Sequence, residues 1–260
     1  MSESGGRVND DYSESHLMAK KRLVPLESLP DIQMERAEID VSAGVCNFST
    51  LFHGNRWTLP VKLSIIVPTM KSRGVHMSRL ISAAQKRMRG EYIEDALKDI
   101  CNEINKSQPG CQITVELEYP VKDQFISVKI MADLNGSIFY SFEKIGITAC
   151  PCSKQIVGIG HMQRSKLKLE ISSNTTIDFE EVDLKLGECF SAEPVEFLKR
   201  SDEGEKILEA QSNPKFVEDL VRDCLKRFPD AVMIEATSSE SIHSHDAIAF
   251  WKKQDYQQTI

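Results

Sequence analysis

Apolar and polar residues alternate along several short stretches of the chain, and other stretches carry apolar residues at helical spacing. Every second position is apolar over 61–67 and over 113–119, which is the period of a half-buried strand. Between these stretches, apolar residues recur at helical spacing over 80–88 and 96–104, with Gly90 as the predicted connection. The strands predicted for the first half are 39–48, 61–67, 113–119 and 125–132.

The same order of elements returns in the second half of the chain. A short acidic helix is predicted after Asp178, and a stronger one at 214–228, where Asn213 and Pro214 suit a helix start. The two halves share element order but no convincing residue-level identity. The strands predicted for the second half are 138–147, 166–171, 231–236 and 247–251.

Pairs of strands with helices between them predict an α+β fold, in which helices cover one face of antiparallel sheets. We expect a flexible N-terminal tail at 1–30, a first ββααββ module at 31–135 and a second module at 136–260, which carries the candidate site. Each module alone would leave its outer sheet edges unpaired. Because such edges invite pairing with other copies, we expect an oligomer.

Composition narrows the class of protein. The 260 residues are 41% hydrophobic and 27% charged, with a net charge of −7, and nucleic-acid binding calls for a basic surface instead. No apolar run approaches the roughly 20 residues of a membrane span, and the N-terminus lacks the apolar segment of a signal peptide. The 7 cysteines are odd in number and dispersed, which indicates reduced thiols. We therefore expect a cytoplasmic protein that binds neither nucleic acid nor membrane.

Candidate metal chemistry lies in three separate segments. Cys150 and Cys152 flank Pro151, His161 follows Gly160, and the segment 240–246 contains two histidines between carboxylates. Thiolate, imidazole and carboxylate are the ligands that zinc prefers. The one-residue gap between the cysteines is too short for a usual zinc knuckle, so the spacing alone slightly favours a buried inert pair at a strand end. For His161 the alternative is a surface histidine without a role. For segment 240–246 it is a polar hairpin between the last two strands.

A basic segment precedes the first predicted helix. Lys71, Arg73, His76 and Arg79 lie within nine residues of one another, next to a helix N-terminus that Ser78 can cap. Cations beside a helix N-terminus are typical of a phosphate site. A solvated basic turn is the alternative, since short charge clusters are commonly no more than that.

Five segments, taken together, resemble the type IB GTP cyclohydrolases, which include bacterial folate-type and archaeal methanopterin-type members. The resemblance runs from about residue 30 to residue 251 and keeps the order of the motifs. It implies a tunnelling fold with two ββααββ modules per chain, assembled into a homotetrameric barrel with sites at subunit interfaces. The five segments are KSRGVHMSR at 71–79, CPCSK at 150–154, GHMQRS at 160–165, NPKFVED at 213–219 and ESIHSH at 240–245.

The resemblance also implies a reaction. A metal-activated water adds to C8 of GTP, the imidazole ring opens, formate leaves, and reclosure gives a 7,8-dihydroneopterin phosphate, either the triphosphate or a cyclic phosphate, as the first step of folate or pterin biosynthesis. The cofactor would be one divalent metal per site, Zn²⁺, Mn²⁺ or Fe²⁺.

The family's functional residues carry over to specific positions of this chain. Cys150, His161 and Glu203 match the metal ligands, and Glu218 matches the residue that anchors the guanine. The resemblance implies that Glu240, His243 and His245 transfer protons and position the substrate, and that Cys150 is catalytic as well. Charge and position add a last set of candidates, which would hold the triphosphate: Lys71, Arg73, His76, Arg79, Lys154 and Arg164.

Two alternatives stay open from sequence alone. One is a tunnelling-fold enzyme that acts on another purine or pterin, because related folds support different reactions. The other is a non-catalytic scaffold whose cysteine and histidine side chains hold structural zinc, with four protein ligands and no open position.

Overall fold

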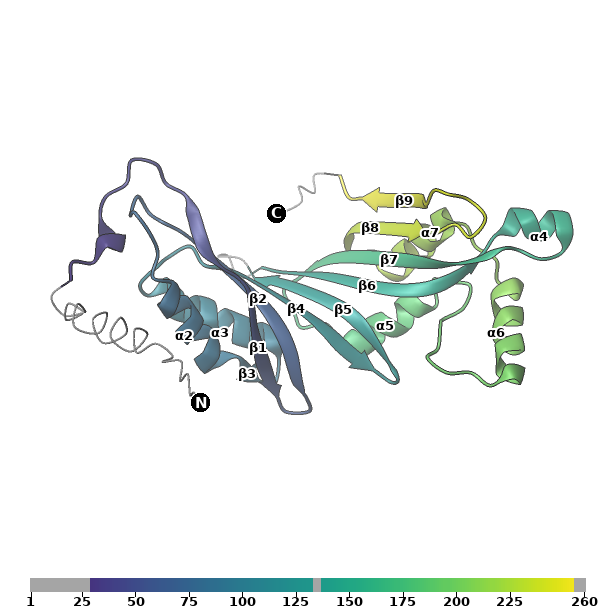
Figure 1. Cartoon of the computed structure of the whole chain (residues 1–260), viewed down its shortest axis with the longest axis horizontal. Helices are drawn as coiled ribbons and strands as arrows, with labels where there is room; N and C mark the ends of the chain where they lie inside the picture. The colour runs from purple at the N-terminus through teal and green to yellow at the C-terminus, as the bar shows by residue number, and fades with distance from the viewer. Residues whose placement is uncertain (1–28, 133–136, 255–260) are drawn as a thin grey trace, which may run out of the picture.

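The computed structural model describes residues 29–132 and 137–254, which form a mixed α+β structure around one nine-stranded sheet. The strand order is β3-β1-β2-β4-β5-β6-β7-β8-β9, and most of the described helices pack along one face of this sheet (Figure 1). The predicted α+β class is therefore confirmed. Nearly all of the predicted N-terminal tail, 1–30, lies outside the described residues.

The first half contains two antiparallel strand pairs with two helices between them. A 3₁₀ turn, η2 (Ile32–Met34), precedes them, and the two-residue strand β3 (Arg89–Gly90) links the helices. The other elements of this half are β1 (Ser42–Gly54), β2 (Thr58–Pro68), α2 (Met77–Arg87), α3 (Ile93–Asn105), β4 (Gln112–Val121) and β5 (Gln124–Ala132).

The second half has the same strand arrangement with more helices. Two of these helices, α4 and α6, are absent from the elements that periodicity predicts. The elements of this half are β6 (Ile138–Ala149), α4 (Pro151–Val157), β7 (Met162–Ser173), α5 (Phe179–Gly187), α6 (Arg200–Ser212), α7 (Val217–Arg227), β8 (Ala231–Ser238) and β9 (Ala247–Lys252).

The sheet continues from one half into the other. β5 and β6 pair antiparallel, with Val128 opposite Phe142 and Ile130 opposite Tyr140. The expected module boundary, between residues 135 and 136, falls in the segment that the structure does not describe. Two halves with the same strand arrangement thus share one continuous sheet and one large hydrophobic core.

The core lies between the sheet and its helices. Leu63, Ile65 and Ile113 are fully buried at every second strand position, as their alternation predicts. Tyr140 and Phe142 stack with ring centroids 5.9 Å apart, and Phe179 from α5 meets both rings edge-on. These aromatic contacts hold α5 against the centre of the sheet.

The predicted start of the last helix is wrong. α7 begins at Val217 rather than at Pro214, and the Asp219 carboxylate accepts a hydrogen bond of 3.0 Å from the backbone N–H of Phe216. The reason is tertiary, because Lys215 N–H donates to the Ala149 carbonyl at 3.0 Å and so ties this segment to the end of β6. Asn213 ends α6 instead of starting α7.

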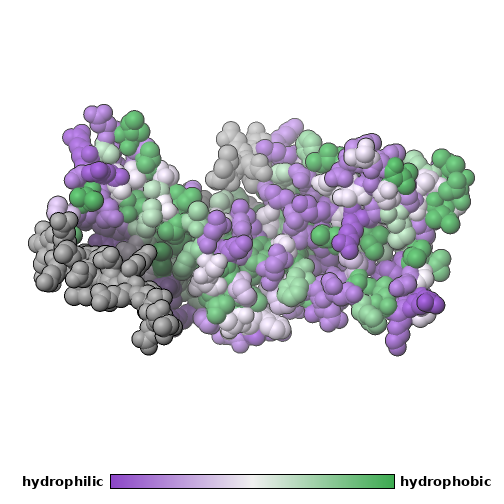
Figure 2. Space-filling model, in the orientation of Figure 1, coloured by the Kyte–Doolittle hydropathy of each residue, from purple (hydrophilic) through white to green (hydrophobic). Residues whose placement is uncertain are grey.

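Exposed apolar side chains occur on the edge strand β9 and around α4. Ile248 and Phe250 on the edge strand β9 are 62% and 71% exposed. Ile156, Val157 and Ile159 in and after α4, at the tip of the molecule beyond the ends of β6 and β7, are also exposed, and Figure 2 shows hydrophobic residues gathered there. No helix in the described ranges is long and apolar enough to cross a membrane.

Candidate active site

Cys150 and His161 face each other across the ends of β6 and β7. The Cys150 N–H donates to the His161 carbonyl at 2.9 Å, directly beyond the paired residues Ala149 and Met162. Opposed residues of an antiparallel pair project their side chains from the same face, with Cα atoms about 5.5 Å apart. The thiol and the imidazole are therefore two donors on one side of the sheet, although their residues are separated by α4.

Two glycines close the chain around α4. Gly158 ends the helix in the left-handed region, at φ 82°. Gly160 lies so close to β6 that a Cβ atom there would be 2.5 Å from the Cys150 carbonyl oxygen. The side chain of Gln211, at the end of α6, accepts from Gly160 N–H and donates to its carbonyl, both at 2.8 Å. This amide holds the loop that presents His161.

The His161 ring has oxygen atoms around one nitrogen. Its Nδ1 lies 2.8 Å from Gln163 Oε1, 3.4 Å from Ser241 Oγ and 3.8 Å from Glu240 Oε2. An amide oxygen at that distance accepts a hydrogen bond from Nδ1–H, so the proton stays on Nδ1 and the lone pair is on Nε2. A neutral imidazole in this tautomer is a metal ligand through Nε2.

The other two candidate histidines stack beside His161. The rings of His243 and His245 lie 5.1 Å apart at 13°, and the His243 ring meets His161 edge-on at 6.4 Å. Residues 241–245 form an exposed bend between β8 and β9 rather than an extended segment. The bend nevertheless brings three imidazoles and the Glu240 carboxylate into one cluster, which is suited to proton transfer near neutral pH.

A buried row of hydroxyl groups on β6, β7 and β8 lies next to this cluster. Thr148 and Ser165 have their oxygens 2.7 Å apart, and Ser165 donates to Ser238 at 3.0 Å; all three side chains are buried. Ser239 N–H donates to the Arg164 carbonyl at 3.0 Å. The row joins β6, β7 and β8 and so sets where Glu240 lies relative to His161.

Glu203 lies apart from this cluster. It is exposed on the first turn of α6, whereas Gln211, which contacts Gly160, lies about two turns or 12 Å further along the helix. Among the described residues no three His, Cys, Asp or Glu side chains are grouped as a metal would require. The structure thus brings together two of the three predicted ligands, and the chemistry of that thiolate–imidazole pair fits a divalent cation such as zinc.

Glu218 and the second-half cations lie near the same strand end. Glu218 is exposed on the first turn of α7, which Lys215 attaches to Ala149 next to Cys150. The Lys154 ammonium donates to the Gln211 carbonyl, so it is turned toward α6. Arg164 is exposed on β7.

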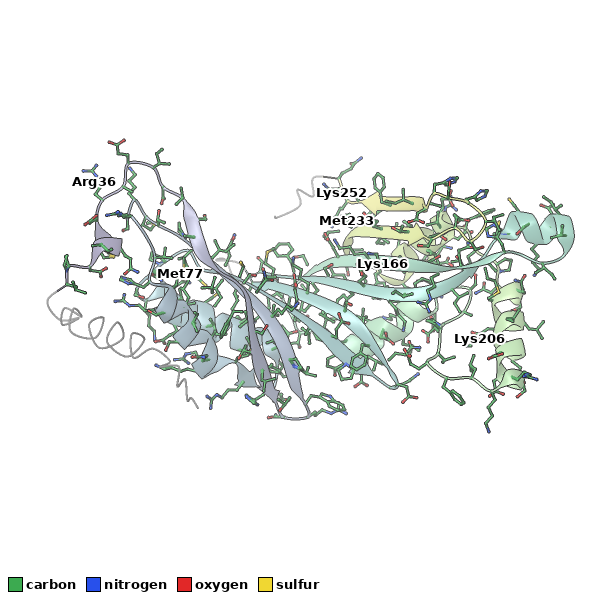
Figure 3. The ribbon with its side chains drawn as sticks, in the orientation of Figure 1. Arg36, Met77, Lys166, Lys206, Met233 and Lys252 are labelled. Carbon is green, nitrogen blue, oxygen red and sulfur yellow. The ribbon has the colours of Figure 1, made fainter. Side chains whose placement is uncertain are left out.

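The basic segment 71–79 lies at the opposite end of the folded molecule from Cys150. Figure 3 labels Met77 in this segment and Lys206 on α6, and the two are separated by most of the molecule's length. Arg73 pairs with Glu35 at 2.6 Å, and His76 Nε2 lies 3.4 Å from Asp31. Lys71 is exposed, while Arg79 lines a groove between α2 and α3. One chain therefore places Lys154 and Arg164 near its predicted metal ligands, but not the predicted phosphate-binding residues of segment 71–79.

Four more residues belong to the site, although no sequence motif predicts a role for them: Ser153, Gln163, Gln211 and Ser241. Ser153 Oγ accepts from His161 N–H at 3.0 Å. Gln163 had a sequence signal, since it lies two positions from His161 on the same strand face. Gln211 had none, because its contact spans 51 positions along the chain.

The relatives found by comparison with known proteins are GTP cyclohydrolases. A GTP cyclohydrolase MptA from Picrophilus torridus is 27% identical over 266 residues, covering 89% of this chain and 96% of the relative. FolE2 GTP cyclohydrolases from Syntrophotalea carbinolica and Thermotoga maritima are 32% and 31% identical, covering 68% and 72% of this chain and 74% and 79% of their own lengths.

A solved uricase from Arthrobacter globiformis overlaps 87% of this chain and 98% of its own, at 8% identity and a TM-score of 0.48, a likeness too distant to bear on function. The family model described as type I GTP cyclohydrolase folE2 matches residues 29–249, which is most of the chain. The chain belongs to the type I GTP cyclohydrolase folE2 family.

Proposed function

We propose that this chain is a GTP cyclohydrolase, which opens the imidazole ring of GTP, releases C8 as formate and forms a 7,8-dihydroneopterin phosphate. One observation carries the proposal beyond family membership. Cys150 and His161 are paired across two strand ends, with Glu240 3.8 Å from the His161 ring. Hydrolysis at C8 needs an activated water and a nearby proton carrier, and this pair and its carboxylate are suited to both tasks.

Each part of the cluster has a distinct task in the proposal. Cys150 and His161 would hold a divalent cation, which supplies hydroxide near neutral pH by lowering the pKa of a bound water. Glu240, His243 and His245 move protons to the ring nitrogens as the C8–N bonds break. Glu218 accepts hydrogen bonds from the guanine N–H groups and so orients the base.

Glu203 is the proposed third ligand, and it requires α6 to approach Cys150 more closely than it does here. The helix is weakly held, because Ala210 is its only buried residue. Few contacts would therefore be lost if α6 tilted about the Gln211–Gly160 hydrogen bonds. Three protein ligands would leave an open position for water, as a catalytic zinc site requires.

Assembly completes the proposed site. We infer a tunnelling-fold homotetramer in which the basic residues of one copy, including Lys71 and Arg73, reach the Cys150 end of another. Support comes from their separation within one chain (Figure 3) and from the two sides of the sheet: β9 is an edge strand, and β1 is covered by β3 only at His53 and Gly54. The exposed apolar side chains of Ile156, Val157 and Ile159 are a further surface for such contacts.

Metal-dependent turnover of GTP tests the function. Metal-stripped protein is expected to be inactive and to regain formate release on addition of Mn²⁺, Fe²⁺ or Zn²⁺ in anaerobic buffer, with a fluorescent pterin after oxidation of the product. Cys150→Ala should lose bound metal and turnover together. Unchanged GTP with every metal, or turnover by a different purine or pterin only, would contradict the proposal.

A further inference from the structure

A groove of about 730 Å³ runs between α2 and α3. These two helices lie at the end of the folded molecule opposite Cys150 (Figure 1). Its walls are mostly hydrogen-bond donors and cations. The polar and charged residues that line it are Ser78, Arg79, Ser82, Lys86, Arg87, Glu103, Ser107 and Gln108.

The single carboxylate in this lining is already neutralised. Glu103 accepts from Arg87 at 2.9 Å and from Lys106 at 2.8 Å, and the Lys106 hydrogen bond, with Arg87, lowers its pKa. Within the described ranges, Arg79 and Lys86 have no carboxylate partner. The groove therefore keeps two uncompensated cations in a protein whose net charge is −7.

A buried donor in the groove wall lacks a partner. Gln108 Oε1 accepts from the His76 N–H at 2.7 Å, which fixes the orientation of the amide. Its Nε2 is then buried without a hydrogen-bond partner among the described residues. Such a donor is unfavourable unless a ligand or water accepts from it, and an anion that enters the groove would supply the missing acceptor.

We propose that the α2–α3 groove binds an oligophosphate group. Arg79 and Lys86 would neutralise the charge, the Ser78 and Ser82 hydroxyls would donate to non-bridging oxygens, and Gln108 Nε2 would donate to the ligand. The oligophosphate is either the tail of GTP held at a neighbouring copy's site or part of a separate phosphorylated molecule. In the first case the inference rests on the proposed function, and in the second it does not.

Binding of inorganic tripolyphosphate, measured by calorimetry without GTP or metal, tests the groove directly. Wild-type protein should bind it, and Lys86→Glu and Gln108→Glu should each weaken binding by about tenfold or more. Gln108→Glu keeps the acceptor for His76, removes the donor and adds one negative charge, and Lys98→Glu controls for the charge. Lys98→Glu, the same charge change elsewhere on the helical layer, and Cys150→Ala should bind as the wild type does.

Steady-state kinetics separate the two sources. A raised KM for GTP with unchanged kcat in Lys86→Glu identifies the GTP tail, whereas an unchanged KM with lost tripolyphosphate binding identifies a separate molecule. Absence of tripolyphosphate binding by the wild type overturns the inference. Equal losses in Lys98→Glu and Lys86→Glu also overturn it, since they indicate attraction to net charge alone. Because this binding is measured without GTP, its outcome is independent of whether the chain turns GTP over.

Discussion

The hydrogen bond between His161 and Gln163 decides which ring nitrogen can bind a cation. With Gln163 Oε1 at 2.8 Å from Nδ1, the proton belongs on Nδ1 and the lone pair on Nε2. Partners of this kind orient metal-binding histidines and make the ring a better ligand. Gln163 is thus a positioning residue, and its contribution can be measured apart from catalysis.

Replacing Gln163 is expected to weaken metal binding. Gln163→Leu removes the acceptor at Nδ1 and should lower the affinity for Zn²⁺ by about 10- to 100-fold, in competition with a chromophoric chelator. Gln163→Glu keeps an acceptor and should retain most of the affinity. Equal affinities in the wild type and the leucine variant would show that the contact does not position His161.

Glu94 links stability to pH at a different place in the structure. Its side chain is buried against Tyr140, whose hydroxyl donates to Glu94 Oε1 at 2.8 Å, and burial raises the pKa of the Glu94 carboxyl. A raised pKa in the folded state means that the folded protein holds the proton more tightly than the unfolded chain. The stabilisation is therefore complete below the unfolded pKa and is lost as the pH rises through the folded pKa.

Glu94→Gln should remove that loss, because an amide does not ionise. The free energy of unfolding is measured in urea from pH 4 to pH 8. As the pH rises, its value for the variant should increase relative to its value for the wild type. Glu103→Gln is the control on the same helix, since Lys106 and Arg87 lower the pKa of that exposed carboxyl and the trend has the opposite sign. Parallel curves for Glu94→Gln and the wild type would contradict the account.

At the scale of elements, the strands and the packed helices follow from periodicity, while the helices around the site do not. β2 and β4 bury every second residue against one core, so alternation alone predicts them. α6 buries only Ala210, and α4 buries none of its seven residues, so neither has an apolar stripe to detect. Both are held by hydrogen bonds between residues distant in sequence, which a periodic pattern does not contain.

Close approach at Gly160 is the element-scale feature on which the site depends most. A Cβ atom there would lie 2.5 Å from the Cys150 carbonyl oxygen, so Gly160→Ala should separate the ends of β6 and β7. Bound metal and turnover should fall together, while far-UV circular dichroism stays close to that of the wild type. Gly204→Ala is the matched control, because nothing lies within 4 Å of its Cβ position and alanine favours the helix by about 1 kcal/mol. A Gly160→Ala protein with full metal content would refute this prediction.

At the scale of the whole molecule, the residue types at the site were predictable and their assembly was not. Cys150, His161, Glu240, His243 and His245 stand out by chemistry, and the structure gathers them. No local sequence pattern predicts that Arg73 pairs with Glu35, or that segment 71–79 lies at the end of the molecule far from Cys150. Those placements depend on the sheet order, which joins strands through contacts distant in sequence.

The proposed assembly predicts that the apolar end at α4 is buried between copies. Ile156 and Val157 are 81% and 70% exposed in the single chain. The double variant Ile156→Ser, Val157→Ser should dissociate the oligomer, measured by light scattering after size exclusion, and should lose GTP turnover with its fold intact. Leu184→Ser, a 56% exposed site on α5, is the control. An unchanged oligomer with full activity would rule out this end as an interface.

Carbon-13 NMR on [8-¹³C]GTP tests the central claim most directly, because it follows the one atom that the proposed reaction removes. With metal-loaded wild-type protein, the label is expected to appear as formate in one equivalent per pterin formed, and Cys150→Ala should leave it in the nucleotide. Labelled carbon that stays within a purine or a ring-opened nucleotide after complete conversion of GTP would contradict the account.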